Sequence, residues 1–430
     1  MKTLLNKTFI ILFFGVYFIP EAFSSIDRIG PQFLVLSVLN IIGFSYLFFN
    51  YDDYVKPFIK SLKKEYIYLI SYFSFLFFSF LSIIYVINLP EFVITFSQYF
   101  TVFITFILTL LFLYRIKEKF DFFINLFVLL TFFEVLYMLV EFIPLYDFDK
   151  GILRNRFYSG AAANINIASF SLAYKSPVII YKILTAKRSF SLFVFSLILS
   201  MLVFCIFITY TRGAFLALSF SFCSMLIYFI YKNFNKMKRV YIKNIAFSIL
   251  TIGFTFMVFK FLNQNNLNTK LTERYASISL DTKDGSVNQR LRYYKQVLER
   301  ASKNPFVGVG LGNHKLISIN DDKFDISQYI IPYHAHNDFL QILSESGILA
   351  LLSYILFLFF LFRYIFLLWY KSPDKDQKFL FFTLFVILMI YMIDASLNFP
   401  IARPINQVQF VFLASIIISS YLGIINYEKR

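Results

Sequence analysis

Cysteine and histidine are scarce in this chain: its 430 residues include two cysteines and three histidines. Cys205 and Cys223 both fall within long apolar stretches, so neither a disulfide framework nor a thiolate metal cluster is indicated. His334 and His336 have the spacing of a zinc-binding pair, but no third ligand stands at a recognisable spacing. We therefore expect neither a metal site nor a cofactor.

Charged residues are also few, at 15% of the chain, whereas 59% of the residues are apolar and 21% are aromatic. A soluble domain has roughly 45–50% apolar residues. Apolar runs of roughly 17–25 residues recur, and a helix of that length crosses a membrane. The sequence predicts an all-α polytopic membrane protein with about twelve transmembrane helices, near residues 4–20, 31–49, 66–88, 91–113, 121–143, 160–181, 190–210, 213–231, 240–261, 345–369, 379–397 and 405–426.

The first run has a second interpretation, because Lys2, Lys7 and the small residues near Ser24 also fit a secretory signal peptide. The eleven further runs favour an uncleaved first helix.

The net charge of +16 could indicate nucleic-acid binding, but the positions of the basic residues favour a membrane topology instead. With the N-terminus in the cytoplasm, 22 basic residues fall in the termini and short loops of that side. By the positive-inside rule, both termini are expected in the cytoplasm, and no nucleic-acid role is expected. The short loops of the other side carry six basic residues: Arg28, Lys150, Arg154, Arg156, Arg212 and Arg403.

One long hydrophilic segment, residues 262–336, is expected outside as a periplasmic loop. It separates helices one to nine (1–261) from helices ten to twelve (337–430) within a single integral membrane domain. Ser286 and Gln289 have the pattern of a capping box, and apolar residues follow at helical spacing. We predict a surface helix of about 15 residues here, ended by Asn304-Pro305.

A glycine-rich turn at residues 308–313 follows that helix. It lacks the third glycine at dinucleotide-binding spacing and no βαβ pattern surrounds it, which excludes a Rossmann motif. Tight backbone packing is favoured over direct contact with a ligand.

The six outer basic residues are all arginine except Lys150. An arginine fork binds phosphate oxygens in pairs and keeps its charge at any pH. Any one of them could instead be an interface anchor, but Arg212 lies in a helix–helix turn that needs no guanidinium. With Arg156, Arg403 and Arg290 of the surface helix, it suggests a cationic cluster suited to a diphosphate.

The densest polar segment runs from Tyr333 to Gly347, directly before an apolar run. Polar groups at the mouth of a membrane helix usually mark a site. Its histidines could be structural, but a general base is favoured. Asp338 or Glu345 could orient that base, and Glu345 could equally cap the helix. Glu134, in the fifth predicted helix, could be protonated or pair with a polar group of another helix.

Four motifs in this order resemble the O-antigen ligase and polymerase superfamily over about residues 154–360. They are Arg156-x-x-x-Gly160 with Asn164-x-Asn166; Thr209-x-Thr211-Arg212-Gly213; Arg290 with residues 304–313; and His334-x-His336-Asn337 with Leu340-Gln341 and Glu345-x-Gly347. Thr211 stands where the family often has serine, and Ile165 where it commonly has proline.

The resemblance implies a fold similar to the class C integral membrane glycosyltransferases and a glycan donor linked to undecaprenyl diphosphate, with no required metal. It implies that Arg212 and Arg290 hold the donor diphosphate. His336 would act on the acceptor hydroxyl, with His334 as the second candidate. Arg156, Asn337 and Arg403 are the further substrate-binding candidates.

The predicted function is therefore that of an inner-membrane glycosyltransferase with a periplasmic active site, in lipopolysaccharide or other polysaccharide biosynthesis. Ligation of O-antigen to the lipid A core is the first interpretation, and polymerisation of repeat units or transfer to protein are alternatives with other acceptors. The rival class is a transporter of the same lipid-linked sugars. It would need polar groups and interrupted helices near the midplane, whereas these helices contain few internal glycines or prolines.

Overall fold

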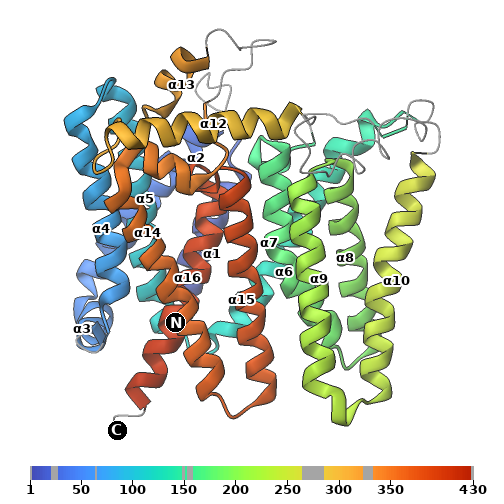
Figure 1. Cartoon of the computed structure of the whole chain (residues 1–430). Helices are drawn as coiled ribbons and strands as arrows, with labels where there is room; N and C mark the ends of the chain where they lie inside the picture. The colour runs from blue at the N-terminus through green and yellow to red at the C-terminus, as the bar shows by residue number, and fades with distance from the viewer. Residues whose placement is uncertain are drawn as a thin grey trace.

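The computed structural model describes residues 2–20, 28–62, 65–147, 151–152, 158–263, 285–322 and 333–427. Over these ranges the chain is helical, and eleven helices are long and apolar enough to cross a membrane, which confirms the predicted all-α polytopic fold. They stand side by side in Figure 1. Their bounds are α2 (Ile29–Phe49), α4 (Ile67–Leu81), α5 (Leu89–Tyr114), α6 (Lys119–Phe142), α7 (Ile165–Leu184), α8 (Ser189–Ile208), α9 (Arg212–Asn233), α10 (Arg239–Leu262), α14 (Asp338–Lys371), α15 (Lys375–Leu397) and α16 (Pro404–Tyr427). The 3₁₀ turn η2 (Ser82–Tyr85) extends α4.

The first predicted run, residues 4–20, forms a shorter element than the others. Helix α1 (Lys2–Phe13) ends early and continues as the 3₁₀ turn η1 (Phe14–Phe18). At about 1.5 Å per α-helical residue and about 2.0 Å per 3₁₀ residue, the two span roughly 28 Å, close to the thickness of the hydrocarbon. The stretched turn thus compensates for the short helix.

Three further helices lie outside the membrane-crossing set. Helix α12 (Gly285–Lys303) runs across the top of the bundle in Figure 1 and confirms the predicted surface helix, which ends before Asn304-Pro305. The side chain of Ser286, from the predicted capping box, lies outside the described residues. Helix α13 (His314–Asp322) and the amphipathic α3 (Tyr51–Leu62) were not predicted.

Contacts between loops divide the molecule into two ends. At the end that carries α12, here called the α12 face, Arg28 donates to the Gly160 carbonyl at 2.8 Å. Asn313 there accepts from the amide nitrogen of Asn88 at 2.7 Å, although the two are far apart in sequence. The predicted alternation of loops between two sides is therefore confirmed on this face.

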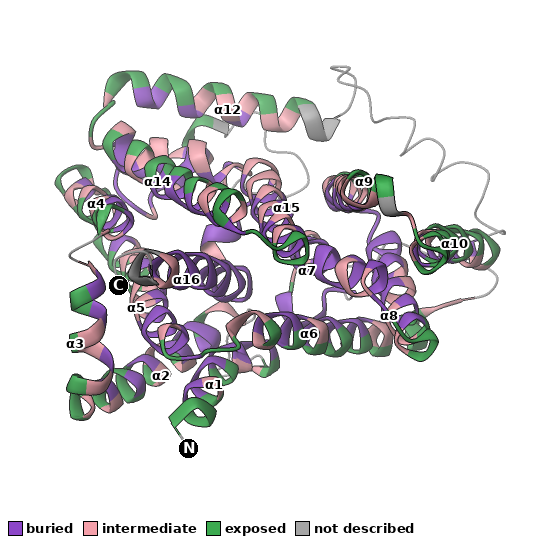
Figure 2. Ribbon diagram, turned by 90° about the horizontal axis from the view of Figure 1, so that it is seen from below, coloured by how far each residue is buried: buried purple, intermediate pink, exposed green. Residues whose placement is uncertain are grey.

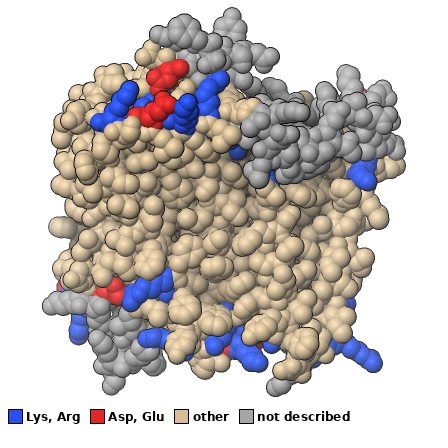
Figure 3. All heavy atoms as spheres, viewed as in Figure 1, with Lys and Arg blue, Asp and Glu red and all other residues tan. Residues whose placement is uncertain are grey.

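At the opposite end, Lys2 pairs with Asp53 at 2.5 Å and Lys232 pairs with Asp376 at 2.5 Å. Figure 3 shows the visible Lys, Arg, Asp and Glu side chains in rims at these two ends, with a broad uncharged band between them. Such a band is what a bilayer requires, because charged side chains are costly in hydrocarbon.

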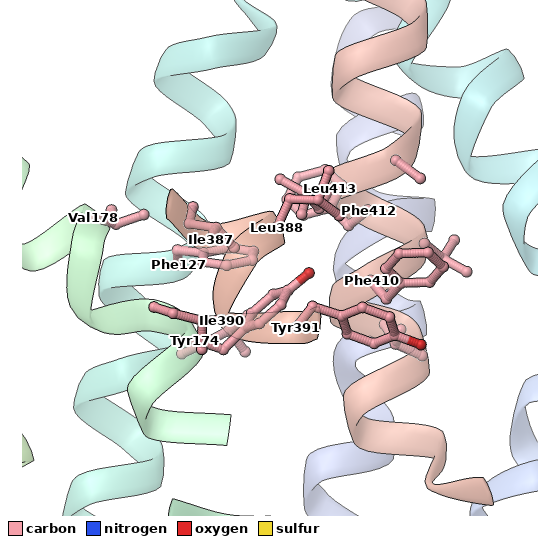
Figure 4. Packing of buried hydrophobic residues seen from close by; sticks show 14 of the residues in the cluster. Phe127, Tyr174, Val178, Ile387, Leu388, Ile390, Tyr391, Phe410, Phe412 and Leu413 are labelled. Atoms are coloured by element: carbon pink, nitrogen blue, oxygen red, sulfur yellow. The ribbon is translucent and has the colours of Figure 1, made fainter. Parts of the chain in front are cut away.

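Aromatic side chains fill the core where α6, α7, α15 and α16 meet (Figure 4). Tyr391 of α15 stacks on Phe410 of α16 with ring centroids 4.1 Å apart, and Tyr174 of α7 meets the edge of Tyr391 at 6.3 Å. These rings give the bundle a close-packed centre beneath the α12 face.

The core also holds one buried ion pair. Lys175 of α7 lies 2.5 Å from Glu134 Oε2 of α6, and both side chains are almost fully excluded from solvent. Lys175 also donates to the Ser171 carbonyl at 2.8 Å. Of the two states considered for Glu134, the structure shows the contact with a polar group of another helix.

Candidate active site

Helix α14 begins earlier than the sequence predicted, within the polar segment from Tyr333 to Gly347. Helix α14 begins at Asp338, and Asn337 is its N-cap, accepting from the Leu340 amide at 3.0 Å. The prediction that this helix starts near residue 345 was wrong, and Glu345 does not cap it. An Asn N-cap satisfies an amide that the first turn leaves free, which favours the earlier start.

Helix α14 is broken at Gly347, whose φ of 80° and ψ of −178° are non-helical. The break frees backbone groups, and the glycine-rich turn satisfies them. Val309 donates to the Ser344 carbonyl at 2.9 Å, and Gly310 donates to the Glu345 carbonyl at 3.0 Å. Buried backbone groups need such partners, so the turn stabilises the break.

These glycines allow the two backbones to approach closely. A Cβ on Gly308 would lie 2.5 Å from the Glu345 carbonyl carbon, and a Cβ on Gly347 would lie 2.6 Å from the Val307 nitrogen. Both glycines also have positive φ, at 72° and 80°. The interpretation of the turn as tight backbone packing is confirmed.

The two histidines of the loop before α14 share one aromatic neighbour. The ring of His334 stacks on Phe399 at 4.1 Å, and the ring of His336 meets its edge at 5.3 Å. The Arg403 guanidinium lies 4.9 Å from the centre of the same ring. Phe399 belongs to the loop between α15 and α16, which Asp338 holds by accepting from the Ile401 amide at 3.0 Å.

Gln341, one turn into α14, orients His334. Its Oε1 accepts from the Ala335 amide at 3.4 Å and lies 3.3 Å from His334 Nδ1, while its Nε2 donates to Glu345 Oε1 at 3.4 Å. Since Gln341 presents its oxygen to the ring, Nδ1 carries the proton and Nε2 is left as the basic nitrogen. Glu345 therefore reaches His334 through Gln341.

Burial keeps all three histidines neutral. Burial, and then the charge of Arg290, lowers the pKa of His336 to about 4. Burial, reinforced by Arg403, lowers the pKa of His334 well below its usual value. The pKa of His314 falls to about 3 through burial and the nearby Arg300. An imidazole that is neutral at physiological pH can accept a proton.

Helix α12 brings Arg290 to these histidines. One turn after Arg290, the Tyr294 hydroxyl donates to the His336 carbonyl at 3.3 Å and lies 3.4 Å from the Ser396 carbonyl. Asn337 Nδ2 donates to the same Ser396 carbonyl at 3.2 Å. The end of α15 thus joins the surface helix to the histidine loop.

Arg212 is the first residue of α9, and the next residue, Gly213, lies against the end of α15. A Cβ on Gly213 would lie 3.1 Å from Leu397, the last residue of α15, so α9 begins against the end of α15. The structure therefore gathers Arg212, Arg290, Arg403, His334, His336 and Asn337 around the end of α15 at the α12 face. Arg156 lies outside the described residues.

Sequence reasoning missed three residues of this cluster as site residues: Tyr294, Gln341 and Phe399. Tyr294 lies one turn from Arg290 on the predicted surface helix, and this spacing was the available signal. Gln341 belongs to the Leu340-Gln341 part of the fourth motif, but the motif does not indicate which residue its side chain contacts. Nothing in the sequence pairs Phe399 with a histidine 65 residues earlier. Among the described residues, no group of three or more His, Cys, Asp or Glu side chains could hold a metal ion.

Comparison with known proteins adds one match. Residues 195–355 match the family described as O-antigen ligase, a segment from within α8 to within α14 that contains Arg212, Arg290 and both loop histidines. No curated protein matches the chain. Three of the four motifs lie in the matched segment, and over residues 195–355 the chain is similar to the O-antigen ligase family, in agreement with the resemblance that the motifs carry.

Proposed function

We propose that this protein transfers a glycan from undecaprenyl diphosphate to an acceptor hydroxyl, and that it acts as an O-antigen ligase on the lipid A core. The observation that carries the proposal is the cluster of arginines and neutral histidines at one end of the bundle, of which Arg212, Arg290 and both loop histidines lie in the segment that matches the family. A membrane-embedded transferase needs fixed cations for a lipid diphosphate and a base for a hydroxyl.

In the proposed mechanism, Arg212 and Arg290 hold the diphosphate. Negative charge develops on this leaving group as the bond to the anomeric carbon breaks, and fixed positive charges stabilise it. The acceptor oxygen attacks the anomeric carbon and loses its proton to a base. Arg403 extends the cationic site. Arg156, which lies outside the described residues, and Asn337, whose side chain caps α14, stay predictions as substrate-binding residues.

We assign the base to His336, because the charge of Arg290 acts on its ring and so couples the base to the diphosphate site. Its backbone has a positive φ of 54°, a conformation that Tyr294 supports by binding its carbonyl. His334 is the second candidate, because Gln341 fixes its tautomer with Nε2 available. Replacing each histidine by alanine in turn, and measuring kcat and KM separately, identifies the base as the one whose loss lowers kcat.

We further propose that the α12 face is periplasmic and that both termini are cytoplasmic, in the bacterial inner membrane. The distribution of basic residues supports this orientation, with 22 on one side. Cysteine accessibility tests it: a cysteine at Lys295, 80% exposed on α12, should react with a membrane-impermeant maleimide in intact spheroplasts. A cysteine at Lys56, in α3 at the opposite end, should react only after lysis.

The function is tested by reconstitution with an undecaprenyl-diphosphate-linked glycan and two acceptors, the lipid A core and a second donor molecule. Glycan on the lipid A core supports ligation. A ladder on the lipid carrier would instead indicate polymerisation of repeat units. Protein-dependent movement of donor between leaflets without transfer would favour a transporter. Arg212→Ala should abolish transfer and leave membrane insertion intact.

A further inference from the structure

Arg300 is a buried cation that the proposed mechanism does not use. It lies in the last turn of α12, on the helix face that also buries Tyr293, Val297 and Ala301. Figure 2 shows α12 beside α14 at the edge of the bundle, with both buried and exposed residues along it. An arginine is rarely buried unless its charge is paired, so the partners of Arg300 indicate its role.

The first partner of Arg300 is Asp321, near the end of α13. Arg300 Nε donates to Asp321 Oδ2 at 2.7 Å, and Arg300 Nη2 donates to the same oxygen. The side chain of Asp321 is 33% exposed and that of Arg300 is 8% exposed, so the pair leads from the protein surface inward. Two charge-assisted hydrogen bonds fix the plane of the guanidinium and tie α12 to α13.

The second partner of Arg300 is His314, the first residue of α13. Arg300 Nη1 lies 3.2 Å from His314 Nδ1, and since a guanidinium can only donate, Nδ1 is the unprotonated nitrogen of the ring. His314 Nε2 is buried and has no hydrogen-bond partner within the described part of the chain. The contact with Arg300 therefore determines the tautomer and the orientation of this imidazole.

The backbone of His314 continues these contacts toward the histidine loop. Its amide nitrogen donates to Glu345 Oε1 at 3.2 Å, and Gln341 Nε2 donates to the same oxygen at 3.4 Å. The other end of the Gln341 amide group lies 3.3 Å from His334 Nδ1. One chain of hydrogen bonds thus runs from the surface to the site, through Asp321, Arg300, His314, Glu345, Gln341 and His334.

We propose that Arg300 and Asp321 are positioning residues for glycan transfer, which hold the start of α13 against Glu345 and so keep Gln341 and His334 in one arrangement. Arg300 lies about 15 Å further along α12 than Arg290, so one helix positions both the diphosphate contact and the histidine loop. This inference rests on the proposed function, because it gives the pair a role in that reaction.

The first test reads the histidines directly, by ¹⁵N NMR of the full-length protein labelled at histidine. The chain has three histidines, so each imidazole can be assigned by replacing one histidine at a time. In the wild type we expect the proton on Nδ1 of His334 and on Nε2 of His314. Arg300→Met removes every donor and should give His334 a mixture of tautomers. Lys303→Met, at an exposed position on the same helix, should leave the spectrum unchanged.

The second test measures glycan transfer. Because His334 stacks on Phe399, which also meets His336, a displaced His334 disturbs whichever histidine is the base. We expect Arg300→Met to lower kcat by about 10–10²-fold and to leave KM for the donor within about twofold, as for a small displacement of a reacting group. Asp321→Asn should lower kcat less. The double variant should be no worse than Arg300→Met alone, since the two residues act as a unit.

The two tests separate this inference from the proposed function. If the wild type transfers no glycan, the proposed function fails, whereas a mixture of His334 tautomers in Arg300→Met still supports positioning by the pair. An unchanged His334 tautomer in both Arg300→Met and Asp321→Asn overturns the inference, and so does a raised KM with unchanged kcat. Asp321→Asn keeps the side-chain shape and the charge of Arg300, so it provides the test if Arg300→Met does not fold.

Discussion

Replacing Gly347 by alanine tests the glycine-clamped break in α14. Gly347 has φ 80° and ψ −178°, a region that only glycine populates readily, and forcing another residue into it costs about 1–3 kcal/mol. The added Cβ would also overlap the backbone of Phe306 and lie 2.6 Å from the Val307 nitrogen. Overpacking of this kind costs about 1–3 kcal/mol more, so Gly347→Ala should destabilise the protein by about 2–6 kcal/mol.

The assay combines thermal unfolding in detergent with glycan transfer. We expect a lower apparent Tm and a loss of transfer, because the break sets the position of Gln341 and the histidine loop. Gly253→Ala is the matched control: this glycine lies inside α10, a Cβ added to it would meet no atom within 4 Å, and alanine there should stabilise the helix by about 0.5–1 kcal/mol. An unchanged Tm and full transfer in Gly347→Ala would refute the view that close packing of these glycines holds the break in α14.

Three further predictions follow from the site and the core. Arg290→Ala should lower kcat by about 10²–10³-fold, while Lys295→Ala, exposed on the same helix, should stay within about twofold of the wild type. If His336 is the base, kcat/KM should be flat near neutral pH and fall as pH drops through about 4, where the ring becomes protonated; a fall centred near the usual value of 6.5 would contradict this. Lys175→Met should cost about 3–5 kcal/mol by leaving Glu134 buried without its cation, and adding Glu134→Gln should restore most of that loss, as denaturation in detergent would show.

The fold was predictable because the apolar runs have membrane-crossing length and the basic residues alternate between sides. The sequence was less informative where amphipathic or polar groups decide the structure. Helix α3 was not predicted because it lies in a basic loop, although Tyr54 and Phe58 have helical spacing and are buried. The predicted start of α14 was too late because Asp338, Gln341 and Ser344 interrupt the apolar pattern before residue 345, whereas Asn337 caps the helix at residue 338.

The candidate site was predictable as a set of residue types and not as a set of contacts. Arg212, Arg290 and the two histidines stood out because charge and imidazole are rare next to apolar runs. Their meeting point at the end of α15 depends on Ser396 and Leu397, whose roles are a backbone carbonyl and a close packing contact. Neither role requires a particular residue type, so neither could be predicted from the sequence.

The buried pair of Lys175 and Glu134 has a consequence for biogenesis. Helix α7 has the lowest mean hydropathy of the eleven membrane-crossing helices. A lysine at the centre of an isolated helix opposes membrane insertion by about 2.5–3.5 kcal/mol. Glu134 lies in the helix made just before it, so its carboxylate is present when Lys175 leaves the ribosome. We expect α6 and α7 to enter the bilayer together as a hairpin, because Glu134 of α6 offsets the cost of inserting Lys175 of α7.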